Sequence, residues 1–173
     1  LTLYYQYSDI SKQFKFGAFP RRNCINFPLA MLTDTLLYYR PNIEGLYGRI
    51  SWPWGHQAGF VDWVSRQTEI KRENFMAGFS GEISHQSIFL QNYLLLFHDA
   101  GAAVHVPGDH IKDYFGYLIQ AGVRSSGSSL FTGIIKAGVL GSLFRERTVT
   151  DGFINQNSFY AEAEGKYKNY GIK

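Results

Sequence analysis

The sequence lacks the cysteine pairs that stabilise small secreted domains and the long apolar runs that form transmembrane helices. It contains one cysteine, Cys24, which excludes an internal disulfide and a zinc site made from several cysteines. Its longest nearly apolar run, residues 88–97, is interrupted by Gln91 and Asn92. A transmembrane helix needs about 18 or more consecutive apolar residues. We therefore expect no membrane-spanning helix.

Charge of either sign is also sparse and is not gathered into runs. The formal net charge is +3, and the densest basic positions are the pair Arg21-Arg22 and the lysines near residue 170. Nucleic-acid binding calls for a clustered basic stripe, so we expect no nucleic-acid partner. Nor does the chain begin with Met or with the basic and apolar segments of a signal peptide. We therefore expect a processed chain or a portion of a longer protein.

Aromatic and glycine residues are abundant instead, and they alternate with polar residues. Aromatic residues make up 17% of the chain, and 18 residues are glycine. Residues 159–167 place Phe, Ala, Ala, Gly and Tyr at every second position, while Glu162, Glu164 and Lys166 occupy positions between them. A period of two is that of a β-strand with one uncharged face and one charged face. Similar alternation runs through 75–84, 114–124 and 131–142.

These alternating segments are about 10 to 12 residues long. Strands of globular proteins usually have about 5 or 6 residues, whereas tilted membrane strands need about 9 to 11. The fold class predicted is therefore all-β: an antiparallel up-and-down transmembrane β-barrel with roughly eight to ten strands in this chain. Residues 1–173 would form one barrel domain or part of one. An aromatic-rich β-sandwich is the alternative, with the uncharged faces packed into an internal core.

The remaining segments complete this prediction. Residues 3–7 and 13–19 form a predicted hairpin, and further strands are expected over 43–52 and 57–66. Residues 87–98 would suit either a helix or a strand, and their strand neighbours favour a strand. Short connections at 85–86 and 125–128 alternate with long ones at 100–112 and 146–157. Short turns on one side and long loops on the other are typical of outer-membrane barrels.

Three stretches together carry a family resemblance. They are Phe16-Gly17-Ala18-Phe19-Pro20-Arg21-Arg22, residues 37–45 (LYYRPNIEG) and residues 61–67 (VDWVSRQ). With the strand pattern, they resemble porin-like outer-membrane β-barrel proteins of Gram-negative bacteria of the Bacteroidetes type. Such barrels commonly have twelve or more strands, so the resemblance implies that this chain is a portion of a longer barrel or a smaller relative. It also implies an outer-membrane location.

Within a barrel, the polar alternate residues would face the lumen, where charge is tolerated and tunes selectivity. The predicted lumen or solute-contacting residues lie on the charged face of the last strand and near strand ends and loops; the alternative is a solvated sheet face with ordinary ion pairs. They are Arg21, Arg22, Arg40, Asp62, Arg66, Arg72, Glu162, Glu164, Lys166 and Lys168.

The sequence contains no strong catalytic signature. The stretch Gly78-Phe79-Ser80-Gly81 lacks one residue of the G-x-S-x-G elbow, and no phosphate-binding P-loop occurs. Histidines and carboxylates gather in one loop region, but their spacing matches no compact metal motif. We therefore predict no enzyme, no cofactor and no metal. The weak metal candidates are His98, His105, Asp109 and His110.

The first functional hypothesis is a passive outer-membrane channel for small polar solutes with a charged lumen. Its partners would be the lipid bilayer and lipopolysaccharide, small polar solutes, and further subunits or strands that complete the barrel. The second hypothesis is a soluble carbohydrate-binding β-sandwich, secreted or periplasmic, in which Trp52, Trp54 and Trp63 stack on sugar rings. A third is a barrel that acts as an enzyme or as a structural or adhesion platform.

Overall fold

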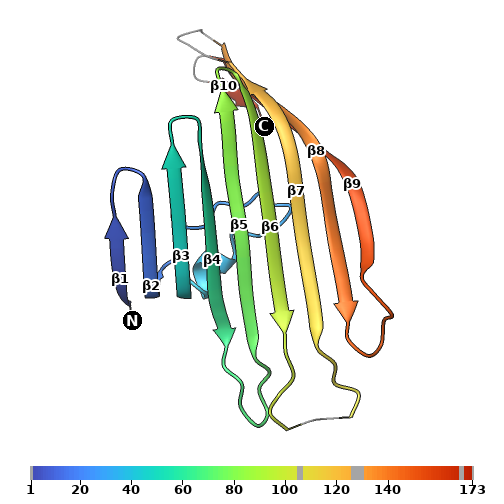
Figure 1. Ribbon diagram of the computed structural model, residues 1–173. Coiled ribbons are helices and arrows are strands. Elements are labelled where there is room, and N and C mark those ends of the chain that lie inside the picture. Colours follow the sequence, from blue (N-terminus) through green and yellow to red (C-terminus); the bar gives the residue numbers. More distant parts are fainter. Residues whose placement is uncertain (1, 105–106, 126–130, 168–169, 173) are drawn as a thin grey trace.

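The chain forms one antiparallel sheet in which every strand lies beside its neighbours in sequence (Figure 1). The structure is a computed structural model that describes residues 2–104, 107–125, 131–167 and 170–172. Its strand order is β1 to β10 without a crossover, and one short helix precedes β3. The elements are β1 (Leu3–Ser8), β2 (Lys12–Pro20), α1 (Leu36–Tyr39), β3 (Asn42–Trp52), β4 (Gly55–Ser65), β5 (Asn74–His85), β6 (Ile88–Asp99), β7 (Lys112–Arg124), β8 (Phe131–Glu146), β9 (Ile154–Tyr167) and β10 (Tyr170–Ile172).

The all-β, up-and-down prediction is confirmed, and the ambiguous segment at 87–98 is the strand β6. The strands from β3 to β9 have 11 to 16 residues, beyond the usual globular length. The described strands form a single sheet, so the β-sandwich alternative is wrong. In the described residues β1 pairs only with β2, and β10 only with β9, so this barrel-like sheet is open. Within the described ranges α1 has four residues, far fewer than a membrane-spanning helix needs.

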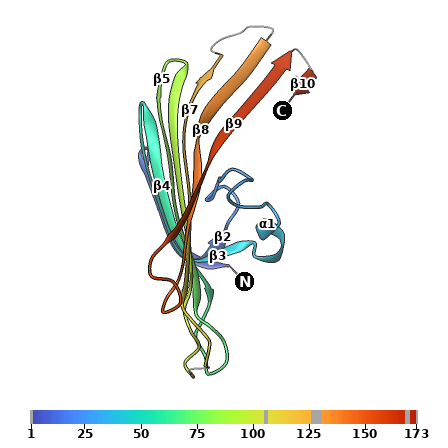
Figure 2. The same cartoon turned by 90° about the vertical axis from the view of Figure 1, so that its right-hand side faces the viewer.

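The sheet is curved and has two unlike faces (Figure 2). Cross-strand pairs place Phe79, Leu94 and Tyr117 in one row, and Ile119 and Val139 in a neighbouring row of the same face. We call this the outward face. Along each strand, the residues at the alternate positions point to the other side of the sheet, where the β2–β3 connection lies. We call that side the concave face. The uncharged stripes read from the sequence all lie on the outward face, as period-two alternation requires.

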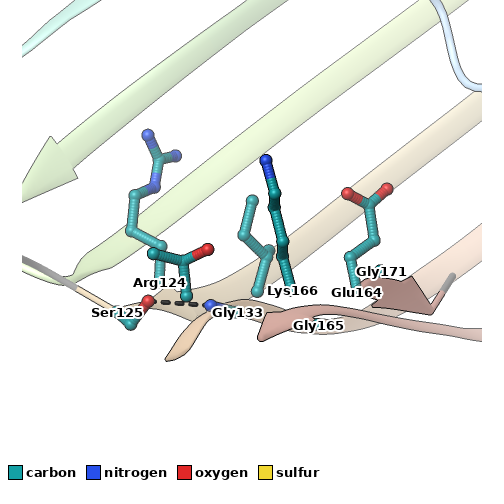
Figure 3. Close-up of a pocket in the computed structure, with 9 residues that line it drawn as sticks. Arg124, Ser125, Gly133, Glu164, Gly165, Lys166 and Gly171 are labelled. Carbon is teal, nitrogen blue, oxygen red and sulfur yellow. Dashed lines mark hydrogen bonds between the residues drawn. The ribbon is translucent and has the colours of Figure 1, made fainter. Parts of the chain in front are cut away.

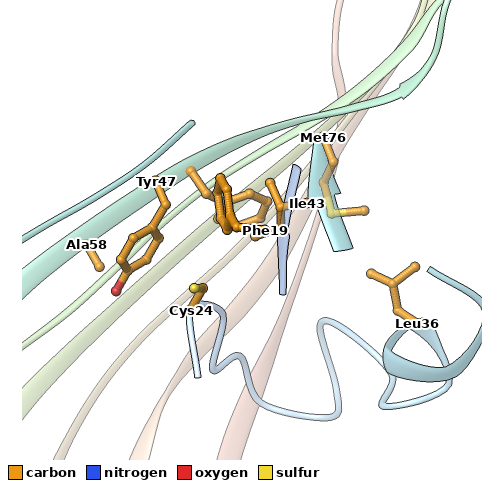
Figure 4. Close-up of a cluster of buried hydrophobic side chains, with 8 residues drawn as sticks. Phe19, Cys24, Leu36, Ile43, Tyr47, Ala58 and Met76 are labelled. Atoms are coloured by element: carbon orange, nitrogen blue, oxygen red, sulfur yellow. The ribbon is translucent and has the colours of Figure 1, made fainter. Parts of the chain in front are cut away.

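The β2–β3 connection, residues 21–41, covers part of the concave face (Figure 2). Phe27 of this connection packs edge-on against Phe60 of β4 and also contacts Tyr93 of β6. Cys24 and Leu36 join a buried cluster of residues from β2 to β5 (Figure 4). The cluster consists of Phe19, Cys24, Leu36, Ile43, Tyr47, Ala58, Phe60 and Met76. The main hydrophobic core therefore lies between this connection and the concave face.

A buried ion pair fastens this connection to the sheet. Arg21 donates to Asp62 of β4, whose side chain is 0% exposed, and Asp62 also accepts from the backbone N–H of Glu44 at 2.9 Å. Arg21 Nε donates to the Arg40 carbonyl at 3.0 Å, so both ends of the connection meet at this carboxylate. A buried charge is tolerated only when it is paired and hydrogen-bonded. This network therefore holds the connection in place.

The connections differ in length at the two ends of the sheet (Figure 1). One end carries the tight turns, such as those between β3 and β4 and between β5 and β6. The other end carries the connections of residues 21–41, 66–73, 100–111 and 147–153, and we call it the long-loop end. The predicted alternation of short and long connections is confirmed among the described residues.

Candidate active site at the long-loop end

An acid–base pair lies on the outward face at the long-loop end. His98 of β6 and Asp113 of β7 are cross-strand partners, and His98 Nδ1 lies 2.5 Å from Asp113 Oδ1. Because a carboxylate only accepts hydrogen bonds, Nδ1 carries the proton in the neutral ring. Nε2 then bears the lone pair, and no described residue forms a hydrogen bond with it. This arrangement makes Nε2 the basic atom of the pair.

Two guanidinium groups flank this pair. Arg147 Nε donates to Asp113 Oδ2 at 3.0 Å, so each carboxylate oxygen has its own donor. Asp113 is only 5% exposed, whereas the Arg147 side chain is 48% exposed. Arg145 of β8 is the cross-strand partner of Asp113, and its guanidinium lies 5.7 Å from the ring centre of Phe153. The guanidinium groups of Arg145 and Arg147 thus place positive charge beside the His98–Asp113 pair, on the side of β8.

Aromatic rings continue the site across the neighbouring strands. Phe75 of β5 pairs with His98 and lies 4.8 Å from it between ring centres. Trp63 of β4 pairs with Phe75 at 6.1 Å, and its Nε1 donates to Glu73 at 3.0 Å. The outward row therefore runs from Trp63 through Phe75, His98 and Asp113 to Arg145.

Below this row the outward face is largely apolar. Along β7 the uncharged positions run from Phe115 to Val123, a length of about 26 Å at ~3.3 Å per residue. Outer-membrane barrels carry an outward apolar band about 25 Å tall. The site thus sits where an apolar band meets charged loops, a suitable place for an amphiphile with a charged head and hydrocarbon chains.

The geometry suits hydrolysis with water as the nucleophile. A histidine whose Nδ1–H is held by a carboxylate has a fixed orientation and a fixed tautomer, which is what a general base requires. Nearby guanidinium groups stabilise the negative charge that develops when a carbonyl is attacked. Together the pair and its arginines carry the parts needed for ester cleavage.

The charged residues expected to line a lumen fall into several separate groups. Arg21, Arg40 and Asp62 form the buried network at the base of the β2–β3 connection. Arg22 is exposed in that connection. Arg66 lines a hollow on the outward face and so lies away from the concave side. Their placement assigns three of these five residues to structural support.

Arg72 belongs to the loops. It contacts Asp99 at 2.6 Å and pairs with Asp109, which joins the β4–β5 connection to the β6–β7 connection. It also donates to the His110 carbonyl at 2.6 Å. Arg72 therefore holds the two long loops together.

The charged residues of the last long strand lie on the concave face, as the alternation predicts. Glu162 pairs with Lys136 of β8 at 3.3 Å and accepts from the Tyr160 hydroxyl at 2.6 Å. Glu164 and Lys166 extend from the same side of the sheet as Arg124 and line a hollow with it (Figure 3). Lys168 lies outside the described residues. This hollow has charged groups but no histidine or cysteine among its lining residues.

The weak metal candidates separate in the structure. His98 faces Asp113, Asp109 pairs with Arg72, and His110 Nδ1 lies 2.7 Å from the Thr148 hydroxyl. His105 lies outside the described residues. In the described ranges, no three His, Cys, Asp or Glu side chains come together as a metal site would require.

Sequence reasoning named His98 only for a metal and did not single out Arg145 or Arg147. The signal that could have found the site is whether a residue number is odd or even, because alternate residues of a strand point to opposite faces. Asp113 has the same odd parity as the uncharged stripe 115–123, and His98 has the parity of Leu94 and Leu96. Asp113 and His98 thus stand at the ends of uncharged stripes on the outward face, and an ionisable residue in that position marks the site.

Comparison with known protein families gives a match. A family model described as lipid A 3′-O-deacylase-type matches residues 1–173. No curated protein and no solved structure matches the chain.

This match corrects two of the sequence predictions. The passive-channel hypothesis and the prediction that the chain is not an enzyme are both wrong, because the family is named for a hydrolytic activity. Nothing supports a porin or a transport role. The fold offers a physical reason, since residues 21–41 occupy part of the concave side on which a channel would run. Because the match spans the full length, this chain belongs to the lipid A 3′-O-deacylase-type family.

Proposed function

We propose that this chain is an outer-membrane esterase that removes an ester-linked acyl chain from lipid A at its outward face. The observation that carries the proposal is the pair of His98 and Asp113, which lies at the end of the apolar band. Family membership supplies the substrate class, lipid A. Lipid A is a phosphorylated disaccharide that bears hydrocarbon chains. A site on the outward face suits a substrate that is itself part of the membrane.

The proposal places the long strands across the outer membrane. Backbone groups in hydrocarbon must be paired within the protein, and the ladders from β3 to β9 satisfy that requirement. Long loops of such barrels lie on the outer side of the membrane. The long-loop end would then lie among lipid A head groups, and the acyl chains would run along the apolar rows beneath it.

The chemistry follows from the arrangement of the side chains. His98 Nε2 takes a proton from a water molecule, and the water oxygen attacks the ester carbonyl carbon. The guanidinium groups of Arg145 and Arg147 stabilise the negative charge on the carbonyl oxygen. The bond between that carbon and the sugar oxygen then breaks, and His98 returns its proton to the departing sugar oxygen. The products are a fatty acid and a free sugar hydroxyl.

Asp113 is a positioning residue in this scheme. It fixes the tautomer of His98 and stabilises the imidazolium that forms during the reaction. Arg147 in turn holds Asp113 in its ionised form at 3.0 Å. Burial of Asp113 keeps water from weakening both contacts.

The proposal is tested by incubating the purified protein with lipid A in mixed detergent micelles and analysing the products. The expected products are a free fatty acid and a lipid A species lighter by one acyl chain, identified by mass spectrometry. Reaction in ¹⁸O-labelled water should place the label in the fatty acid carboxylate, because water attacks the acyl carbon. Intact lipid A after prolonged incubation with folded protein would reject the proposal.

A further inference from the structure

A second hollow lies on the outward face, beside the aromatic end of the row that contains His98. It has a volume of about 480 Å³ and is lined by residues of β2, β3 and β4 and by the residue that follows β4. Its lining combines an indole, a guanidinium and a carboxylate, from Trp63, Arg66 and Glu44, and it also includes Phe16 and Ala18. An exposed ring beside a cation is the combination that binds a charged sugar: the ring packs on the sugar and the guanidinium holds an anion.

A β-bulge brings Arg66 to this face. Trp63 pairs with Phe75, but Ser65 pairs with Asn74, so one extra residue, Val64, is inserted in β4. Regular alternation would place Trp63 and Arg66 on opposite sides of the sheet. The inserted residue reverses the alternation, and both side chains line the same hollow. Bulges of this kind commonly re-aim a side chain beside a functional site.

The hollow is connected to the acid–base pair by a continuous outward row. Trp63 contacts Phe75, Phe75 contacts His98, and His98 contacts Asp113. Two strand spacings separate Trp63 from His98, about 10 Å at ~4.8 Å for each spacing. A disaccharide substrate held at His98 would have to extend over this distance to reach Trp63. Trp63 is 43% exposed, so its ring is open to a ligand.

We propose that Trp63 and Arg66 bind the second phosphorylated sugar of the disaccharide while His98 acts on the first. This inference rests on the proposed function and adds the residues that orient the substrate. Arg66 pairs with the phosphate on the sugar remote from the cleaved ester, and Trp63 packs against that sugar ring. Glu44 accepts hydrogen bonds from its hydroxyl or amide groups. The remote sugar thus sets which acyl ester reaches His98.

Binding is measured separately from cleavage in a His98→Asn background, with vesicles that contain lipid A carrying both phosphates. A second set of vesicles contains lipid A that lacks the phosphate on the remote sugar. Arg66→Gln should weaken binding to the diphosphorylated lipid about tenfold or more, the value of a lost charge-assisted hydrogen bond. The same change should have little effect on the monophosphorylated lipid. Trp63→Ala should weaken binding to both lipids, and Trp63→Phe should restore much of it.

Matched controls are Arg22→Gln and Trp54→Ala, since both residues are exposed and lie outside the hollow. In the active protein, Arg66→Gln should raise KM and leave kcat nearly unchanged. If the Arg66→Gln variant binds each of the two lipids as tightly as its parent does, the subsite proposal is overturned, even if cleavage proceeds normally. Arg66-dependent binding without any cleavage would instead support the subsite and reject the esterase. Failure of the parent to bind either lipid would overturn both proposals.

Discussion

Asp113 holds His98 across the β6–β7 ladder, with 2.5 Å between Oδ1 and Nδ1, while its second oxygen accepts from Arg147. This relationship gives the site a defined tautomer and a stabilised imidazolium. It also predicts how the site fails when the carboxylate is altered.

Asp113→Asn should reduce kcat by about 10²- to 10⁴-fold, because the amide neither fixes the productive tautomer nor stabilises imidazolium. KM for lipid A should change much less, since Asp113 is buried beneath the site. Initial rates of fatty acid release over a range of lipid A concentrations measure both constants. A rise in KM with an unchanged kcat would show that Asp113 serves binding alone.

Asp62→Ala should destabilise the protein by about 3 to 5 kcal/mol, because it leaves the buried Arg21 guanidinium without its partner. The free energy of unfolding in detergent, from a denaturant titration, measures the loss. Asp34→Ala is the control in the same connection, where the aspartate is exposed, and it should be nearly neutral. Equal stability of the two variants would mean that the buried network does not hold residues 21–41.

Ala137→Arg should cost about 2 to 4 kcal/mol in a bilayer, because Ala137 lies on the outward face in the middle of β8. Ser158→Arg, on the concave side of β9, should cost far less because that side of the strand carries polar residues such as Gln156 and Glu162. Unfolding of the two variants from lipid vesicles gives the comparison. A greater loss for the serine variant would reverse the assignment of the two faces.

Acid should weaken the β1–β2 turn. The Ser11 backbone amide, the Tyr7 hydroxyl and the Lys12 backbone amide bind the Asp9 carboxylate and lower its pKa from 3.8 to about 2. A lowered pKa adds stability that is complete above about pH 4 and is lost as the pH falls through about 2. The stability advantage over Asp9→Asn should therefore disappear across that interval. An advantage that persists unchanged below pH 2 would contradict this reading, and a carbon NMR titration of the carboxylate checks the pKa directly.

Much of the sheet was predictable because alternation is a local property. The uncharged stripe of β9 and the charged positions Glu162 and Lys166 follow directly from a period of two. The strand assignment of residues 87–98 also followed, since the neighbouring segments were clear strands. The same reasoning placed the long and short connections at opposite ends.

The path of residues 21–41 was not predictable. Its fixed position depends on Arg21 reaching Asp62, 41 residues away, and on Phe27 reaching Phe60 and Tyr93. No local pattern encodes such contacts, so the sequence suggested a lumen where the structure has a packed connection. Likewise, the outward position of Arg66 depends on the bulge at Val64, which reverses an alternation that the sequence alone suggests is regular.

The catalytic role of His98 is the central claim, and the most direct test compares two histidine variants. His98→Asn and His110→Asn are purified in the same detergent and assayed for release of fatty acid from lipid A by mass spectrometry. His110 is the control because it also lies at the long-loop end, where its ring contacts the Thr148 hydroxyl. We predict that His98→Asn lowers the rate by about 10²-fold or more and that His110→Asn keeps nearly the full rate. Undiminished release by a folded His98→Asn variant would contradict the account.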